Sequence, residues 1–248
     1  MIPMAVDVLF IHPGNHSKSY QALAAEFTAI APPAWALLLA GALRNRGIGT
    51  AIHDVNVEGW DDDILRSLLA RHAPRMVAII VQGHNPSAST QTMPAARRIA
   101  LDLKRIEPDL PLAFGGTHPS ALPSRTLDEE PVDYVLQGEG LYTLEGLVGH
   151  VKGTLDIESV RGLWYRKDGA ATPTAPAPVI ADLDAEMPRY EWDLLPPLAA
   201  YRAHNMHCFD EFRLSERADF SDVRSPYAVL HTSLGCPYAC HYCCVHAL

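Results

Sequence analysis

The sequence predicts an α/β protein whose main domain is a doubly wound, five-stranded parallel sheet. Three observations support this fold class. Strand-like and helix-like patterns alternate over about the first 150 residues. The run Met76–Val81 is continuously apolar, as expected of a central parallel strand that is covered on both faces. Glycine-rich turns follow the last two expected strands, at the sheet edge where parallel α/β proteins bind ligands.

The expected elements follow one another in regular order. The strands are short apolar runs, and they comprise Val6–Ile11, Thr50–His53, Met76–Val81, Leu112–Phe114 and Val132–Leu136. The helices carry apolar residues at helical spacing, and they comprise the segment from Pro33 to Gly47, Asp61–Ala70, the segment with its apolar stripe at Ala95, Ile99, Leu103 and Ile106, and Leu141–Val151. Right-handed crossovers would place the carboxyl ends of all five strands on one edge.

The pattern changes after Gly153. A hairpin is expected from Gly162–Tyr165, the turn Lys167-Asp168-Gly169 and a second strand at Val179-Ile180, with Ala170–Pro178 as an irregular loop. Residues 181–225 contain few periodic signals and are interpreted as a surface connector. A new strand, Tyr227–Thr232, is expected to lead directly into a cysteine-rich loop. The predicted division is therefore 1–152, 153–225 and 226–248.

Composition narrows the functional class. The chain has 248 residues, of which 48% are hydrophobic and 20% charged, as in a soluble globular protein. Its net charge of −9 argues against a nucleic-acid-binding protein, which would carry a basic stripe. No run approaches the ~18 apolar residues of a membrane-spanning helix, and no signal peptide is visible. A cytoplasmic location and a small-molecule partner are therefore expected.

Four of the five cysteines lie between Cys236 and Cys244, and this clustering favours metal ligation over disulfides. Cys236, Cys240 and Cys243 have the spacing C-x3-C-x2-C, and three such thiolates suffice to hold three corners of a [4Fe–4S] cluster. The fourth iron would stay open to a substrate. The alternative is a structural zinc site completed by Cys244, His241 or His246, but the sequence contains no second cysteine knuckle.

Two glycine-rich segments follow the fourth and fifth expected strands: Gly115-Gly116-Thr117-His118-Pro119 and Gly138-Glu139-Gly140. A glycine at a strand end lets the backbone approach a ligand that a Cβ would exclude. Either segment alone is also compatible with a simple tight turn, whereas the two together on one edge favour a ligand site. The G-x-G-x-x-G motif of nicotinamide and FAD sites is absent, and so is a hydrolase nucleophile elbow.

The cysteine loop resembles that of the radical S-adenosylmethionine superfamily, in which the loop follows the first strand of a (β/α) barrel. The resemblance implies a [4Fe–4S] cluster on Cys236, Cys240 and Cys243 whose open iron binds S-adenosylmethionine. It also places Tyr242, the aromatic residue before the third cysteine, near the adenine. Since the sequence stops five residues after Cys243, either the chain is a fragment or a second chain supplies the rest of the barrel.

The whole chain resembles the cobalamin-dependent branch of that superfamily, through both glycine-rich segments and through Gly162-Leu163-Trp164-Tyr165-Arg166 and Trp192-Asp193-Leu194-Leu195-Pro196. The resemblance implies a Rossmann-like or flavodoxin-like cobalamin-binding domain over 1–152, followed by the hairpin and connector and by the start of a truncated radical barrel over 226–248. Cofactor contacts are then expected from Gly115, Gly116, Thr117, His118, Gly138, Glu139 and Gly140, with Ser87 and Ser89 as hydrogen-bonding partners. Family members commonly read G-E-G-E, and here Leu141 takes the fourth place.

Corrinoid carriers and mutases use D-x-H-x-x-G after the first strand to supply a cobalt ligand, and this chain lacks that motif. The similar segment Asp54–Gly59 has Asn56 in place of the histidine and follows the second strand, so we interpret it as a strand-end turn. His12 and His16 lie close enough to the first strand to reach a corrin, but solvation or capping is their default role. Packing is the default role for His84 and His118.

The resemblance implies a cobalamin-dependent radical enzyme, in first place a methyltransferase that acts on an unactivated carbon or phosphorus through a 5′-deoxyadenosyl radical and methylcobalamin. A radical cyclase of the anaerobic tetrapyrrole type is the alternative within the enzyme class. A cobalamin-binding or carrier module with a non-functional cysteine loop is the alternative outside it. The expected partners are a small-molecule or natural-product substrate and a reductant such as flavodoxin or ferredoxin.

Overall fold

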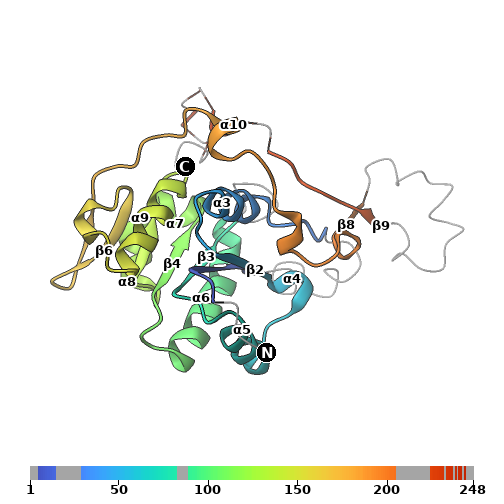
Figure 1. The fold of residues 1–248 in the computed structure, drawn as a ribbon, viewed down its shortest axis with the longest axis horizontal. Helices are drawn as coiled ribbons and strands as arrows, with labels where there is room; N and C mark the ends of the chain where they lie inside the picture. Colours follow the sequence, from blue (N-terminus) through green and yellow to red (C-terminus); the bar gives the residue numbers. More distant parts are fainter. Residues whose placement is uncertain are drawn as a thin grey trace, which may run out of the picture.

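The computed structural model describes residues 5–14, 29–82, 89–204, 224–231, 233–236, 238, 240, 241 and 243. A seven-stranded sheet lies at its centre, with the strand order β2-β1-β3-β4-β5-β6-β7 (Figure 1). Its strands are β1 (Val8–His12), β2 (Thr50–Asp54), β3 (Met76–Ile80), β4 (Leu112–Gly115), β5 (Tyr134–Leu136), β6 (Leu163–Lys167) and β7 (Ala170–Pro173). The first five strands are parallel to one another, which confirms the predicted fold class.

Helices cover both faces of this sheet, because its central strands are apolar on both sides. On one face lie α3 (Ala34–Asn45) and α9 (Leu141–Val151), and on the other α5 (Asp62–His72), α6 (Ser89–Ile106) and α8 (Pro123–Glu129). The sheet lies between these layers in Figure 1. Two short helices, α4 (Val55–Glu58) and α7 (Thr117–Ala121), follow β2 and β4 at the carboxyl edge. No helix in the described ranges is long and apolar enough to cross a membrane.

The hairpin that the sequence predicts is present, but its second strand is nearer the turn than expected. Asp168 and Gly169 both have positive φ, at 52° and 80°, and so reverse the chain directly into β7. The second strand is therefore Ala170–Pro173, and the expectation of a strand at Val179-Ile180 was wrong. The hairpin also pairs antiparallel with β5, so it extends the main sheet by two strands.

The first part of the connector, residues 181–200, passes over the outer side of α3 (Figure 1). The described part of the connector contains α10 (Leu183–Glu186), two 3-10 turns (Trp192–Leu194 and Leu198–Ala200) and β8 (Arg202–His204), which pairs with β9 (Arg224–Pro226). The strand expected at Tyr227–Thr232 does not form over residues 227–231. A strand needs a pairing partner, and among the described segments pairing ends once the Tyr227 N–H has bonded to the Tyr201 carbonyl.

Candidate functional site at the carboxyl edge of the sheet

The carboxyl ends of β1 to β5 bring the predicted site residues to one edge of the sheet. His12 and Asp54 end β1 and β2, and they are register partners in the two strands. Gly115 ends β4 and begins one glycine-rich segment, and the segment that begins at Gly138 follows β5 at the same edge. The sequence analysis therefore located this edge correctly. Ser87, Tyr242, His16 and His84 lie outside the described residues.

Gly116 permits a close approach between β4 and β3. Its φ is +116°, and a Cβ atom there would lie 2.3 Å from the carbonyl oxygen of Val81. A Cβ on Gly115 would be less crowded, at 3.1 Å from the Leu136 side chain. The absence of a side chain at Gly116 is thus required by the protein's own backbone. The sequence pattern did not reveal this requirement, because Val81 is far from Gly116 along the chain.

Ser89 links the end of β3 to the turn after β4. Its hydroxyl donates to the Val81 carbonyl and accepts a hydrogen bond from the His118 N–H at 2.9 Å. The His118 ring in turn lies 2.9 Å from the Thr90 hydroxyl, measured from Nδ1, and burial lowers the pKa of this histidine. The polar groups of Ser89 and His118 are therefore used within the fold, and they shape the edge on which a ligand would rest.

Thr117 is the exception in this turn. Its side chain is buried, and its hydroxyl oxygen has no hydrogen-bond partner among the described residues. A buried hydroxyl normally has a partner, because an unpaired one costs about 1–3 kcal/mol. The Thr117 hydroxyl is thus a buried polar group near this edge that the described residues leave without a hydrogen bond.

Gly138 and Gly140 form an open backbone turn after β5. Both have φ of +85°, a conformation that favours glycine, and Gly140 directly precedes α9. A Cβ added at Gly138 would meet no protein atom within 4 Å. The Gly138 N–H donates to the Ser120 hydroxyl at 2.8 Å, which fixes the turn. Space beside an exposed backbone is what a large planar cofactor with a polar tail requires, so these residues fit such a group.

Glu139 has a different role from its glycine neighbours, because it binds the main chain at Ile180. Its carboxylate accepts a hydrogen bond from the Ile180 N–H at 2.6 Å, just before the connector begins. Burial raises the pKa of this carboxyl, and the hydrogen bond from Ile180 opposes that shift. Glu139 therefore holds the start of the connector. The sequence contained no signal for this pairing, which spans 41 residues.

A second polar group lies at the ends of β1 and β2. Asp54 is fully buried, its Oδ1 accepts from the Asn56 N–H at 3.0 Å, and burial raises its pKa. Oδ2 of Asp54, Nδ1 of His12 and the Tyr201 hydroxyl are all buried, and the Asp54 carboxyl interacts there with both His12 and the Tyr201 hydroxyl. The Tyr201 ring is completely buried, so it fastens the connector over this end of the sheet. The segment Asp54–Gly59 itself forms the capped helix α4, which agrees with its interpretation as a strand-end turn.

The cysteine loop is partly described. Cys236 is exposed, Cys240 and Cys243 are half-buried, and all three are free thiols. The Cys243 N–H donates to the Cys240 carbonyl at 3.0 Å, so these two residues share one turn. Within the described residues, no three His, Cys, Asp or Glu side chains are gathered as metal ligands. The donor chemistry and spacing of the three thiols fit an iron–sulfur cluster, although their side chains are not arranged around one.

Comparison with known proteins agrees with this geometry. The B12 binding domain family model matches residues 20–148, which is more than half of the chain. The chain belongs to the B12-binding domain family. The resemblance to cobalamin-dependent radical S-adenosylmethionine enzymes that the sequence suggested is confirmed by the relatives and structural neighbours of this chain.

Two curated relatives show that the chain is similar both to a cyclase and to a methyltransferase. The anaerobic magnesium-protoporphyrin IX monomethyl ester cyclase of Synechocystis is 28% identical over 213 residues, which cover 86% of this chain and 38% of the cyclase. An uncharacterized methyltransferase of Pyrococcus horikoshii is 29% identical over 193 residues, which cover 77% of this chain and 37% of that protein. The chain thus spans less than two fifths of the length of these relatives.

Solved structures show the same fold. The radical S-adenosylmethionine methyltransferase TsrM of Kitasatospora setae, bound to tryptophan and an S-adenosylmethionine analogue, superposes with a TM-score of 0.56 at 21% identity. The match covers 70% of this chain and 31% of TsrM. The cobalamin-dependent radical enzyme OxsB with aqua-cobalamin gives a TM-score of 0.59 at 19% identity, covering 77% of this chain and 24% of OxsB.

Proposed function

We propose that this chain is the cobalamin-binding part, with the start of the radical domain, of a cobalamin-dependent radical S-adenosylmethionine enzyme. The observation that carries the proposal is one chain that combines a B12-binding domain with a C-x3-C-x2-C loop. The open backbone at Gly138 and the unpaired Thr117 hydroxyl lie at the edge where such domains bind their ligands. The division into 1–152, 153–225 and 226–248 remains part of this proposal.

In this proposal the residues divide into two groups. Gly138, Gly140 and Thr117 would receive the corrin's nucleotide tail, while Gly115, Gly116, Ser89 and His118 shape the edge beneath it. Cys236, Cys240 and Cys243 would ligate the cluster, with Tyr242 beside the adenine of S-adenosylmethionine. When bound, the cluster and cobalamin would supply reductive cleavage of S-adenosylmethionine and a transferable methyl group. The protein's own task is to hold the two groups at a fixed separation and to exclude water.

The proposed reaction is methyl transfer to a small molecule, with electrons from a flavodoxin or ferredoxin. One relative, the cytidylyl-2-hydroxyethylphosphonate methyltransferase of Streptomyces wedmorensis, is 28% identical over 156 residues. The second candidate is radical ring formation, and one observation favours it: the cyclase relative of Rubrivivax gelatinosus matches over 95% of this chain.

Anaerobic reconstitution with iron and sulfide tests the cluster. We expect about four irons per chain, and their loss when Cys236, Cys240 and Cys243 are replaced by alanine. Cys244→Ala is the matched control, because it removes a thiol from the same loop outside the motif. Stoichiometric zinc uptake with no iron would overturn the enzyme proposal, and would leave a cobalamin-binding module.

A further inference from the structure

We infer that Trp35 and Tyr190 form a bracket around His231 that fixes where the cysteine loop leaves the B12-binding domain. The inference deepens the proposed function, because it assigns positioning residues for the separation between cobalamin and cluster. Trp35 lies in the first turn of α3, and Tyr190 lies in the connector. His231 precedes Cys236 by five residues.

Tyr190 satisfies both main-chain groups of His231 through a single hydroxyl. The His231 N–H donates to the Tyr190 oxygen at 2.5 Å, and the same hydroxyl donates to the His231 carbonyl at 3.3 Å. Burial raises the pKa of Tyr190, so the hydroxyl keeps its proton and remains a donor at neutral pH. The main chain at His231 is thus held without a neighbouring strand among the described residues.

Trp35 holds the side chain of the same residue. The Trp35 and His231 rings meet edge to face, with centroids 6.3 Å apart and planes at 82°. Burial lowers the pKa of His231, which favours the neutral ring in this apolar contact. Leu234 continues the contact, because it packs partly buried against the same core cluster as Trp35.

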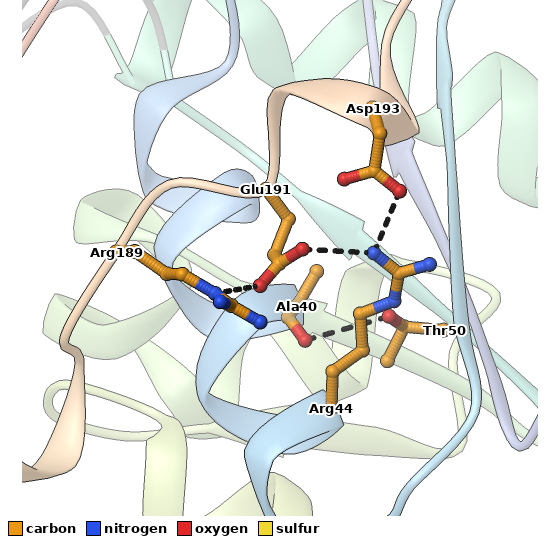
Figure 2. A network of polar contacts seen from close by, with 6 residues as sticks. All are labelled: Ala40, Arg44, Thr50, Arg189, Glu191 and Asp193. Carbon is orange, nitrogen blue, oxygen red and sulfur yellow. Dashed lines mark hydrogen bonds and ion pairs between the residues drawn. The ribbon is translucent and has the colours of Figure 1, made fainter.

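The connector segment that carries Tyr190 is held on α3, and Figure 2 shows its neighbours Arg189 and Glu191 beside Arg44 of that helix. Glu191 accepts from Arg44 of α3 at 3.0 Å and from Arg189 at 2.6 Å. A Cβ on Gly41 of α3 would lie 2.9 Å from the Arg189 carbonyl oxygen, so the connector backbone lies directly on the helix. Tyr190 also stacks on Trp192, with centroids 5.5 Å apart. The bracket is therefore rigid on its connector side.

The position of the bracket links the two proposed cofactor sites. The first turn of α3 lies at the carboxyl edge of the sheet, because α3 follows β1 and returns toward the start of β2. Five residues span at most about 18 Å, so Cys236 must lie within that distance of His231. The bracket thereby fixes the start of the cysteine loop at the carboxyl edge of the sheet, the edge at which Gly138 also lies. Trp35, Tyr190 and His231 are assigned as positioning residues, because they act through the main chain that leads to Cys236.

The first test needs no cofactor. Tyr190→Phe removes the hydroxyl alone, and we expect amide exchange at His231 to accelerate about five- to tenfold, as the loss of one hydrogen-bonding group predicts. Tyr227→Phe is the matched control, because it removes a hydroxyl from an exposed tyrosine four residues away. Unchanged exchange at His231 in Tyr190→Phe would overturn the bracket, whatever becomes of the proposed function.

The second test uses the reconstituted full-length holoprotein. Pulsed electron paramagnetic resonance between the reduced cluster and Co(II) cobalamin measures their separation. We expect a broader distance distribution in Tyr190→Phe and Trp35→Leu, with unchanged iron and cobalamin content. A distribution as narrow as that of the wild type would overturn the positioning role. If exchange changes as expected but no iron or cobalamin is taken up, the proposed function fails and the bracket stands.

Discussion

Gly116 and the Val81 carbonyl stand so close that no other residue fits between them: a Cβ atom would lie 2.3 Å from that oxygen. The second glycine of the Gly115-Gly116 pair is therefore required for the packing of β4 against β3. The glycines after β5 also have a positive φ, but a Cβ added there would meet no protein atom closer than 3.9 Å. Two motifs that look alike in the sequence thus differ in what a substitution would test.

Gly116→Ala is expected to destabilise the fold itself. The substitution adds a steric clash to an unfavourable positive φ, and we expect the free energy of unfolding to fall by at least about 2 kcal/mol. Urea unfolding followed by circular dichroism measures the change. A loss below about 0.5 kcal/mol would show that β3 and β4 can separate at this point.

Gly138→Ala is expected to weaken cobalamin binding while the fold persists. The left-handed backbone costs about 1 kcal/mol, and the methyl group enters the space proposed for the corrin tail. We expect the affinity for hydroxocobalamin to fall about tenfold, which corresponds to ~1.4 kcal/mol. Gly153→Ala is the matched control, because Gly153 also has a positive φ and open surroundings but follows the far end of α9. Equal affinities of the two variants for hydroxocobalamin would show that Gly138 is not part of the cobalamin site.

Ser89→Ala is expected to loosen the turn after β4. It leaves the Val81 carbonyl and the His118 N–H without their shared hydroxyl, and we expect a loss of about 1–3 kcal/mol in unfolding free energy. Thr90→Ala, which removes the exposed contact to the His118 ring, should cost less than about 1 kcal/mol. Chemical denaturation of both variants measures the two losses. A larger loss in Thr90→Ala than in Ser89→Ala would contradict the role given to the Ser89 hydroxyl.

Asp54→Asn is expected to change how stability depends on pH. Because burial raises the pKa of Asp54 in the folded state, the folded protein binds this proton more tightly than the unfolded chain. The contribution of this proton to the free energy of unfolding is favourable at low pH. It is lost as pH rises from about 4, the pKa of Asp54 in the unfolded chain, through the raised pKa in the folded protein. Asp54→Asn should therefore gain stability relative to the wild type as pH rises above about 4. If the difference in unfolding free energy between Asp54→Asn and the wild type did not change with pH, the raised pKa of Asp54 would be contradicted.

Arg44→Met is expected to loosen the connector from α3. Glu191 is largely buried, and among the described residues it would keep Arg189 as its one ion-pair partner. We therefore expect a loss of about 1 kcal/mol in unfolding free energy, smaller at high salt because Arg44 is about a third exposed. Arg98→Met, an exposed change on α6 across the sheet, is the control. Trypsin cleavage near Arg189 should accelerate in Arg44→Met alone, and cleavage at the wild-type rate would argue against the clamp.

The sequence predicted the parts of this molecule that follow from local patterns. Five apolar runs became the five parallel strands, and the helix Leu141–Val151 was predicted to the residue. The edge that gathers the glycine-rich segments follows from this topology alone. The cysteine spacing likewise needs no tertiary information.

The rest depends on contacts between distant segments. Nothing near Glu139 in the sequence indicates that its carboxylate binds the Ile180 N–H, and nothing near Gly116 points to Val81. The second hairpin strand was misplaced because Ala170–Pro173 has no aromatic residue and only one β-branched residue, Thr172, beside two alanines and a proline. Its pairing with β6 makes it a strand. The docking of the connector on α3 is a tertiary property of the same kind.

The connector's contacts with α3 bear on how this domain could be transplanted. Met187 is buried in the core cluster that contains α3, and Gly41 lies beneath the connector backbone. A graft that ended after α9 would expose both the core cluster and the surface of α3 at Gly41 to water. The transferable unit therefore reaches beyond the parallel sheet to about residue 231, and a chimera should join the two parts there.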